Sequence, residues 1–213
     1  MIDTIIFDLD GTLLNTSMDL TNSVNYALKN NNLKIKTVEE VKASLGSGPA
    51  KLIEKTSGLD PNKDLFKKVL KEYLEHYNKN NNVETVLYEG VEELIDEIKK
   101  RNIKTAVLSN KQNIDTQAVI KHYLPNTFDI VIGTSENVKR KPSTDGLLSI
   151  VKSLETKTEN CIYVGDSAVD IETAVKANIK CVSVTYGYRN KKQLQAAGGK
   201  LFIDSPLELL SLI

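Results

Sequence analysis

The sequence lacks an excess of charge of either sign. Lys and Arg together number 28, Asp and Glu also number 28, and the formal net charge is zero. A protein that attracts nucleic acid or an anionic membrane through its overall field needs a basic excess. The composition therefore favours neither partner, and its 40% hydrophobic and 26% charged fractions are those of an ordinary globular protein.

Long apolar runs and cysteines are also scarce. No apolar segment approaches the roughly 20 residues that a membrane-spanning helix needs. Residues 1–8 lack the basic stretch and the long apolar run of a signal peptide. The only cysteines, Cys161 and Cys181, lie beside strand-like segments. We expect a cytoplasmic protein with two free thiols rather than a disulfide.

Short apolar segments rich in β-branched residues recur along the chain, and helical patterns follow them. We expect strands at residues 4–9, 104–109, 129–133, 161–165 and 180–184. Segments this apolar suit a parallel sheet that is covered on both faces. The segments between them carry apolar residues at steps of three and four, as amphipathic helices do; two of these are residues 91–101 and 168–177. The alternation predicts an α/β fold with a doubly wound parallel sheet.

One interval between strands is too long for a single crossover helix, and it has helical patterns throughout. Residues 37–40, Thr-Val-Glu-Glu, form a capping-box pattern that opens a helix. Pro49 suits the first turn of a second helix, with Gly58 as its end. A third helix is expected from Pro61 to about Tyr77.

This interval indicates an inserted domain. We expect an α/β core formed by residues 1–15 and 83–213, with a helical cap of residues 16–82 inserted after the first strand. In open parallel sheets the ligand crevice lies beyond the carboxyl ends of the strands. An insertion that leaves the sheet at that end is placed to cover the crevice.

Carboxylates, a hydroxyl and an ammonium stand where the expected strands end. The segments that carry them are Asp8-Leu9-Asp10-Gly11-Thr12, Ser109-Asn110-Lys111, Lys139-Arg140-Lys141-Pro142 and Gly165-Asp166-Ser167-Ala168-Val169-Asp170. These segments are far apart in the sequence. Because parallel strands end at one edge of a sheet, we expect their polar side chains to converge on one crevice.

The aspartates in this set predict a magnesium site. Side chains alternate along a strand, so Asp8 and Asp10 should point the same way. Two bare carboxylates so close would force one of them to take up a proton. A divalent cation removes that conflict, and Asp166 would supply a further oxygen. Hard oxygen ligands are typical of Mg²⁺, and the absence of His and Cys from the set argues against zinc.

Such a site suits attack on phosphorus. An aspartate can form an aspartyl-phosphate and thereby divide one difficult displacement into two easier ones. The metal, Lys141 and the Ser109 hydroxyl would neutralise the phosphoryl charge. Gly11 would let backbone N–H groups approach the phosphoryl group. Asp10 could protonate the leaving oxygen and then deprotonate the hydrolytic water.

The residues at the strand ends resemble a known family. Asp8-x-Asp10-Gly11-Thr12, Ser109-Asn110, Lys141-Pro142 and Gly165-Asp166-Ser167-x-x-Asp170 are similar, in this order, to the four motifs of the haloacid dehalogenase superfamily. The resemblance spans essentially the whole chain, including the cap. It implies a sheet order of 3-2-1-4-5 in the five expected strands.

The resemblance also implies a role for each motif residue. Asp8 would be the nucleophile, and Asp10 the acid/base. Mg²⁺ would be held by the Asp8 carboxylate, the main-chain carbonyl of Asp10 and the Asp166 carboxylate. Asp170 would lie behind these ligands and hold the metal's waters or Lys141. The residues expected to bind phosphate are Gly11, Thr12, Ser109, Asn110 and Lys141.

Within the superfamily, two later segments favour one branch. Residues 184–188, Val-Thr-Tyr-Gly-Tyr, and residues 203–210 resemble phosphoglycolate phosphatases. The aspartate at position 10 disfavours the dehalogenase branch, although Asn15 stands where many relatives carry an aspartate. In the cap, Gly46, Ser47 and Gly48 precede a helix start and could hold the carboxylate of such a substrate.

The expected function is therefore Mg²⁺-dependent hydrolysis of a small, phosphoglycolate-like phosphate ester. A phosphomutase of the same superfamily acting on a sugar phosphate, and a pyrophosphatase or nucleotidase, stay open as alternatives. A response-regulator receiver also uses paired aspartates, a hydroxyl and a lysine around Mg²⁺, but it carries no inserted cap. We expect a small phosphorylated metabolite as partner, neither nucleic acid nor membrane, and a monomer or a homodimer.

Overall fold

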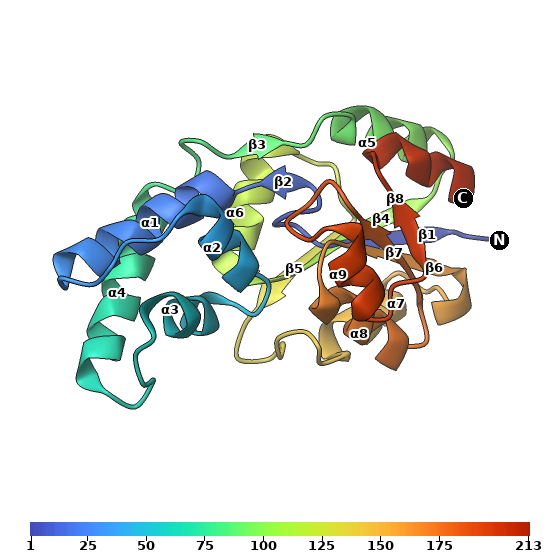
Figure 1. Cartoon of the computed structure of the whole chain (residues 1–213). Helices are drawn as coiled ribbons and strands as arrows, with labels where there is room; N and C mark the ends of the chain where they lie inside the picture. Colours follow the sequence, from blue (N-terminus) through green and yellow to red (C-terminus); the bar gives the residue numbers. More distant parts are fainter. The chain divides into compact units, whose positions relative to one another are not determined.

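The computed structural model describes residues 1–213, and the chain divides into two compact units (Figure 1). The core unit comprises residues 1–14 and 87–213, and the helical unit comprises residues 15–86. The helical unit extends beyond residue 82, the end expected for the insertion. The cause is local, because the carboxylate of Asp19 accepts hydrogen bonds from the main chain of Val83, Glu84 and Thr85.

A six-stranded sheet forms the centre of the core unit. Its order is β5-β4-β1-β6-β7-β8, and every pairing is parallel. The strands are β1 (Thr4–Phe7), β4 (Lys104–Gln112), β5 (Ile130–Thr134), β6 (Cys161–Gly165), β7 (Lys180–Val184) and β8 (Leu201–Ile203). The doubly wound α/β fold is confirmed, and the five expected strands have the expected order. The sixth strand, β8, extends the edge beyond β7.

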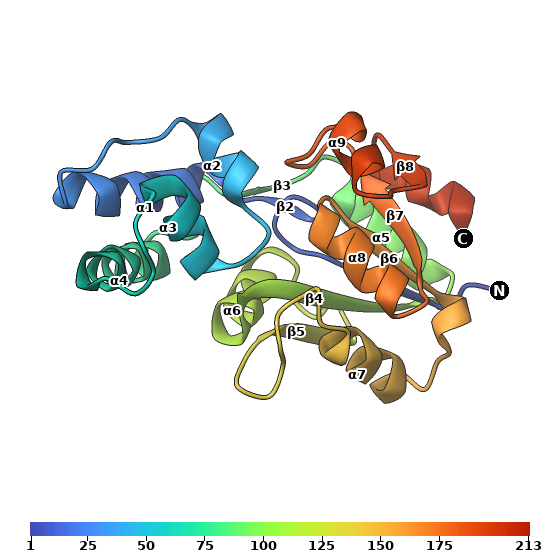
Figure 2. The ribbon, with the colours of Figure 1, turned by 60° about the horizontal axis from the view of Figure 1, so that its bottom comes forward.

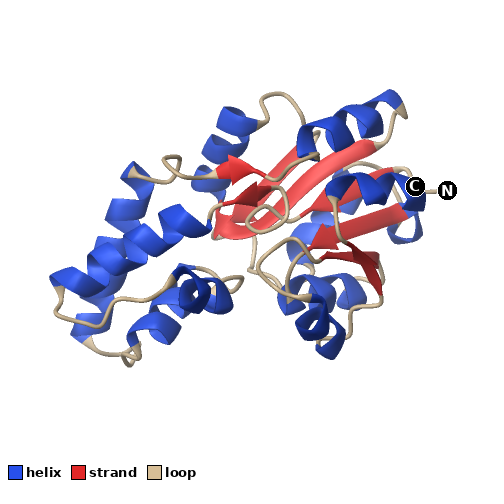
Figure 3. Cartoon of the chain, turned by 45° about the horizontal axis from the view of Figure 1, so that its top comes forward, coloured by secondary structure: helices blue, strands red, loops and turns tan.

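Helices cover both faces of this sheet (Figures 2 and 3). Apolar side chains of α5 (Val91–Lys100), α6 (Asn113–Tyr123) and the 3₁₀ segment η2 (Pro206–Leu212) pack on one face. Those of α7 (Asp145–Ser153) and α8 (Ala168–Lys176) pack on the other. Side chains of β1 alternate between the two buried clusters, as the pleat requires. The remaining short elements are η1 (Thr158–Asn160) and α9 (Lys191–Ala196).

The helical unit consists of α1 (Ser17–Asn30), α2 (Val38–Ser44), α3 (Pro49–Ser57) and α4 (Asp64–Lys79). The predicted capping box is present, with Thr37 and Glu40 each bonding the other's main chain. The helix α3 ends at Gly58, as predicted, and this glycine has the left-handed conformation. No helix in either unit has the length and apolar character that crossing a bilayer would require.

The predicted start of α4 at Pro61 is wrong. Asp60 forms a turn there, because its side chain accepts from the N–H of Asn62 at 2.9 Å and its carbonyl from that of Lys63 at 3.0 Å. Proline fits the interior of such a turn as well as it fits the first turn of a helix. The helix therefore begins at Asp64.

Two very short strands join the units. β2 (Leu14–Asn15) and β3 (Val86–Leu87) pair with each other in a separate two-stranded sheet. The chain thus leaves the core unit and returns to it through paired segments. On the core side of this crossing, the N–H of Tyr88 donates to the carbonyl of Leu13 at 3.1 Å.

Candidate active site

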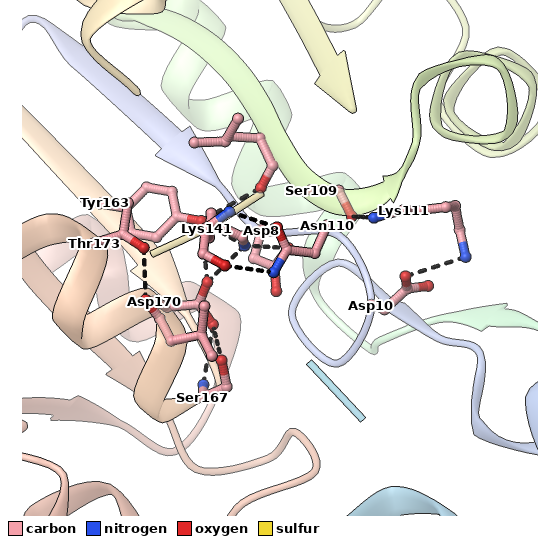
Figure 4. Close-up of polar contacts among 12 residues, drawn as sticks. Asp8, Asp10, Ser109, Asn110, Lys111, Lys141, Tyr163, Ser167, Asp170 and Thr173 are labelled. Atoms are coloured by element: carbon pink, nitrogen blue, oxygen red, sulfur yellow. Dashed lines mark hydrogen bonds and ion pairs between the residues drawn. The ribbon is translucent and has the colours of Figure 1, made fainter. Parts of the chain in front are cut away.

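The sheet topology brings the expected site residues to one edge. Asp8 directly follows β1, and β1 lies between β4 and β6. The end of β4 carries Ser109, and Asp166 directly follows β6. Lys141 comes from the loop between β5 and α7 and joins them from outside the central strands (Figure 4).

Lys141 is the centre of the polar network. Its side chain is 3% exposed, and its Nζ lies 2.8 Å from Asp8 Oδ1 and 2.6 Å from Asp170 Oδ1. It also donates to the hydroxyl of Tyr163 at 2.8 Å. Burial alone would lower the pKa of Lys141, but Asp170 and Asp8 outweigh it and raise this pKa above its usual value. The ammonium therefore stays charged and uses all three of its donors.

This geometry refines the expected role of Lys141. The sequence predicts that Lys141 binds phosphate, whereas in the structure its ammonium holds the nucleophile candidate Asp8. A contact with a phosphate oxygen would have to replace one of the three present partners. The ammonium is close enough to Asp8 to contact a phosphoryl group that is bound to this carboxylate.

Asn110 fixes the main chain of Lys141. Its amide nitrogen donates to the Lys141 carbonyl at 3.1 Å, and its amide oxygen accepts from the Lys141 N–H at 2.7 Å. This two-point contact ties the end of β4 to the loop that carries the lysine. The amide thus positions Lys141, and a phosphate contact by Asn110 stays a prediction.

Asp170 lies at the start of α8 and is fully buried. One of its oxygens receives Lys141 and the hydroxyl of Tyr163, which donates at 3.1 Å. The other accepts from the N–H and the hydroxyl of Ser167, at 3.1 and 2.6 Å, and so caps the helix. Both oxygens are engaged, which suits a carboxylate that holds Lys141 rather than a metal ion.

Three buried carboxylates form an acidic cluster that could hold a metal ion. Asp8, Asp166 and Asp170 each offer an oxygen, and these oxygens lie within 4.8 Å of one another. Burial raises the pKa of Asp8 well above its usual value, Asp170 and Asp166 raise it further, and Lys141 opposes them. Burial and Asp170 raise the pKa of Asp166 to about 7.

The donor set of this cluster fits a divalent cation. The cluster holds three carboxylates around the single ammonium of Lys141. A cation bound between Asp8 and Asp166 would favour their charged forms, and so oppose the burial and the carboxylate repulsion that raise both pKa values. The ligands are all hard oxygens, which favours Mg²⁺ over zinc.

Gly11 and Thr12 shape the loop beside Asp166. Gly11 has φ +88°, and a Cβ on it would lie 2.4 Å from Asp166 Oδ2. Only glycine therefore fits where the loop passes the metal ligand candidate. Thr12, predicted to bind phosphate, is fully buried, and its hydroxyl oxygen has no hydrogen-bond partner.

The predicted orientation of Asp10 is wrong. Strand β1 ends at Phe7, so the alternation of a strand does not continue through residues 8–10. The Asp10 carboxylate instead pairs with the Nζ of Lys111 at 3.1 Å, apart from the Lys141 network (Figure 4). Its side chain is thus outside the acidic cluster, and only its main-chain carbonyl remains a candidate metal ligand.

Sequence reasoning missed several residues that the structure places around the site. Lys111 and Ser167 stand inside the motifs that point to the site, so their position was a usable signal. Tyr163 lies within an apolar strand and gave none. The N–H of Tyr188 donates to Asp166 Oδ2 at 2.8 Å through its main chain, which no side-chain pattern reveals.

The predicted specificity residues lie in the helical unit. Gly46, Ser47 and Gly48 form the loop between α2 and α3. Gly46 and Gly48 have φ values of +102° and +83°, which favour glycine, and Gly48 is the N-cap residue of α3.

The chain is similar to known hydrolases along most of its length. Residues 5–184 match the model of the haloacid dehalogenase-like hydrolase family. The chain is 33% identical to a phosphoglycolate phosphatase of Colwellia psychrerythraea, over 98% of this chain and 95% of that protein. It is 27% identical to an N-acetylmuramic acid 6-phosphate phosphatase of Pseudomonas putida, over 98% and 95% of the two chains.

A solved structure shows the same architecture. The crystal structure of a predicted phosphoglycolate phosphatase from Haemophilus somnus superposes with a TM-score of 0.91 at 26% identity, covering 99% of this chain and 97% of that one. The chain belongs to the haloacid dehalogenase-like hydrolases, and it is a phosphatase.

Proposed function

We propose that the chain hydrolyses the monoester of a small phosphorylated metabolite, of the phosphoglycolate kind, through an aspartyl-phosphate on Asp8. One observation carries this proposal above the others. The Asp8 carboxylate is buried at the carboxyl end of the central strand, 2.8 Å from a lysine ammonium and beside two further carboxylates. The similarity to phosphoglycolate phosphatases supports the substrate class.

The chain's own residues would hold Mg²⁺ at this site. The ligands we propose are the carboxylates of Asp8 and Asp166 and the main-chain carbonyl of Asp10. When bound, the ion would offset the negative charge of the phosphoryl group and of the carboxylates around it. Asp170 is not among the proposed ligands, because Lys141, Tyr163 and Ser167 already engage its oxygens.

The first step would form a bond between a carboxylate oxygen of Asp8 and phosphorus. The bond between phosphorus and the ester oxygen breaks, and Asp10 gives a proton to the oxygen that leaves. Lys141 holds Asp8 in place through its 2.8 Å contact. The Ser109 hydroxyl, whose oxygen accepts from the N–H of Lys111 at 3.1 Å, would donate its proton to a phosphoryl oxygen.

The second step would return the enzyme to its starting state. Asp10 takes a proton from a water molecule, the water oxygen bonds to phosphorus, and the bond from phosphorus to Asp8 breaks. Phosphate leaves with the oxygen of that water. Asp10 thus gives up one proton in the first step and takes up one in the second, so it ends the cycle protonated as it began.

The helical unit would determine which ester is accepted. The core residues described above would contact the phosphoryl group, which all candidate substrates share. We propose that residues 15–86 act as a cap over the site. Gly46, Ser47 and Gly48 would contact the carboxylate of the substrate through main-chain N–H groups at the start of α3.

A panel of phosphorylated metabolites tests the function. Phosphate release is measured with Mg²⁺ and with a chelator, and Asp8→Asn serves as the control for contaminating phosphatase. We expect Mg²⁺-dependent release that is fastest for small carboxylated monoesters such as 2-phosphoglycolate. Conversion of a sugar phosphate without phosphate release would identify a phosphomutase instead. Release in the Asp8→Asn variant within tenfold of the wild type would overturn the mechanism.

A further inference from the structure

A second buried lysine lies at the edge of the site, outside the Lys141 network. Lys111 stands near the end of β4, and its side chain is 6% exposed. A lysine so far from solvent costs stability unless its charge is paired. Its Nζ lies 3.1 Å from Asp10 Oδ2, and the Asp10 side chain is 22% exposed.

The main chain of Lys111 is held by hydrogen bonds at both its N–H and its carbonyl. Its N–H donates to Ser109 Oγ at 3.1 Å, and its carbonyl accepts from the hydroxyl of Thr134 at 3.2 Å. The register of β4 against β5 shifts between Leu108 and Gln112, so Lys111 belongs to an irregular segment of the strand. A Cβ on Gly133 would lie 2.7 Å from the Lys111 carbonyl, so β5 can approach this segment only with glycine there.

These contacts direct the ammonium to one place. The stem of Lys111 begins from a fixed main chain and is enclosed by protein, which leaves its side chain few alternatives. Asp10, by contrast, belongs to the loop after β1 and precedes Gly11, whose φ is +88°. Lys111 is the more buried partner of the pair, so its ammonium offers the Asp10 carboxylate a fixed position.

The two lysines of the site serve different carboxylates. Lys141 contacts Asp8 and Asp170, whereas Lys111 contacts Asp10, and Figure 4 shows the two groups apart. Burial raises the pKa of Asp115, a residue of α6, and the charge of Lys111 opposes this rise. The Lys111 ammonium thus holds the proposed acid/base separately from the nucleophile.

We propose that Lys111 is a positioning residue for the reaction, which sets the orientation of the Asp10 carboxylate through the ion pair at Oδ2. This inference rests on the proposed function, in which Asp10 transfers the proton of the leaving group. A proton donor works only within hydrogen-bond reach of its acceptor. Displacement of a reacting group by about 1 Å can cost on the order of 100-fold in rate.

Leaving-group dependence separates this role from a purely structural one. An aryl phosphate has a good leaving group that needs little protonation, whereas 2-phosphoglycolate has a poor one. Formation of the Asp8 phosphoenzyme is followed in single-turnover experiments with both esters. The variants are Lys111→Met, Asp10→Asn and their combination. The matched control is Lys139→Met. Lys139 is exposed, and its Nζ makes only a long ion pair, of 3.9 Å, with Asp145.

We expect Lys111→Met to slow reaction of 2-phosphoglycolate by about tenfold or more and that of p-nitrophenyl phosphate by less than about threefold. Asp10→Asn should show the same selectivity with a larger loss, of about 10²–10⁴-fold. The double variant should be no slower than Asp10→Asn within about threefold, because Lys111 has nothing left to position. Lys139→Met should react like the wild type with both esters.

Other outcomes overturn specific parts of the argument. An equal loss on both esters in Lys111→Met, or losses that multiply in the double variant, would show that Lys111 does not act through Asp10. A wild type inactive on every ester, or an Asp10→Asn variant without leaving-group selectivity, would overturn the proposed function itself. If Lys111→Met does not fold, Lys111→Gln replaces it, since its amide can still donate to Asp10. It should then retain more activity on 2-phosphoglycolate than Lys111→Ala.

Discussion

The buried carboxylate of the helical unit and the buried carboxylates of the core unit have opposite kinds of neighbours. In the helical unit, Asp19 is 1% exposed and accepts from the N–H groups of Val83, Glu84 and Thr85 and from the Thr85 hydroxyl, at 2.8 to 3.1 Å. All four donors are neutral and fixed by the fold. In the core unit, the Asp8 carboxylate faces two other carboxylates and one ammonium.

The difference separates a structural carboxylate from a reactive one. Neutral donors around Asp19 satisfy its lone pairs without adding charge, so the fold alone stabilises it. The neighbours of Asp8 raise its pKa, and a bound cation or phosphoryl group would complete its environment. A residue of the first kind contributes to stability, and a residue of the second kind contributes to function at some cost in stability. The first three predictions below test this difference.

The largest effect is expected from Asp8→Asn. An amide is a poor nucleophile, so phosphate release should fall by about 10⁴-fold or more. Thermal unfolding of the metal-free protein should occur at the same or a higher temperature, because the variant removes one of three mutually repelling carboxylates. Kinetics and calorimetry on one preparation check both halves. Strong destabilisation by Asp8→Asn would show that Asp8 is a structural residue, as Asp19 is.

The pH dependence of stability should be unusual in the metal-free protein. The pKa of Asp166 is about 7 in the folded state against 3.8 for the ordinary group, so the folded state binds the proton more tightly. Stability should therefore be highest near pH 4 and fall as pH rises to about 7, by roughly 2–4 kcal/mol. Mg²⁺ competes with this proton, so it should stabilise the protein more at pH 8 than at pH 5.

Chemical unfolding in a chelator and in Mg²⁺ at both pH values measures this dependence. Asp166→Asn is the control, because it removes the titrating group and should flatten much of the fall in stability between pH 4 and 7. If the stability of the metal-free protein rises with pH over that range, the assignment of Asp166 to a cluster of mutually repelling carboxylates is wrong.

Asp19→Asn should have the opposite profile to Asp8→Asn. The amide turns an NH₂ group toward N–H donors, so at least one buried donor loses its partner, at a cost of about 2–3 kcal/mol. Urea unfolding measures this loss. Asp60→Asn in the same unit is the matched control, since Asp60 is an exposed turn residue and should change stability by less than about 0.5 kcal/mol. Activity per folded molecule should stay close to the wild type.

The smallest effect is expected in the loop before α3. Ser47→Asp adds a negative charge there, which should raise KM for 2-phosphoglycolate about three- to tenfold and leave KM for p-nitrophenyl phosphate nearly unchanged. Ser44→Asp, at the last residue of α2, is the control for an added charge elsewhere in the unit. Parallel changes with both esters would show that residues 46–48 form only a turn between helices.

Much of the fold follows from local patterns. The strands at residues 161–165 and 180–184 have their predicted bounds, because a short segment rich in apolar and β-branched residues defines each of them. The three-residue strand β8 offers too short a run to recognise, and its only strand neighbour is β7. The start of α4 was misplaced since Pro61 is compatible with a turn and with a helix, and the side chain of Asp60 decided between them.

The positions of the strand ends predict three of the residues that gather at the site. Strand ends carry Asp8, Ser109 and Asp166, and a parallel sheet must bring its strand ends to one edge. Motif order then identified the family. These conclusions need only residue types and their spacing, because topology converts sequence position into a position at the sheet edge.

Which side chain contacts which is visible only in the folded chain. Tyr163, from within an apolar strand, reaches Lys141 and Asp170, and Lys111 rather than the acidic cluster holds Asp10. Asp19 satisfies a chain segment more than sixty residues away, which contains no motif. The physical reason is that hydrogen bonds and ion pairs depend on distances of a few tenths of an ångström. Packing and backbone turns such as the one at Gly11 set those distances, and residue spacing does not encode them.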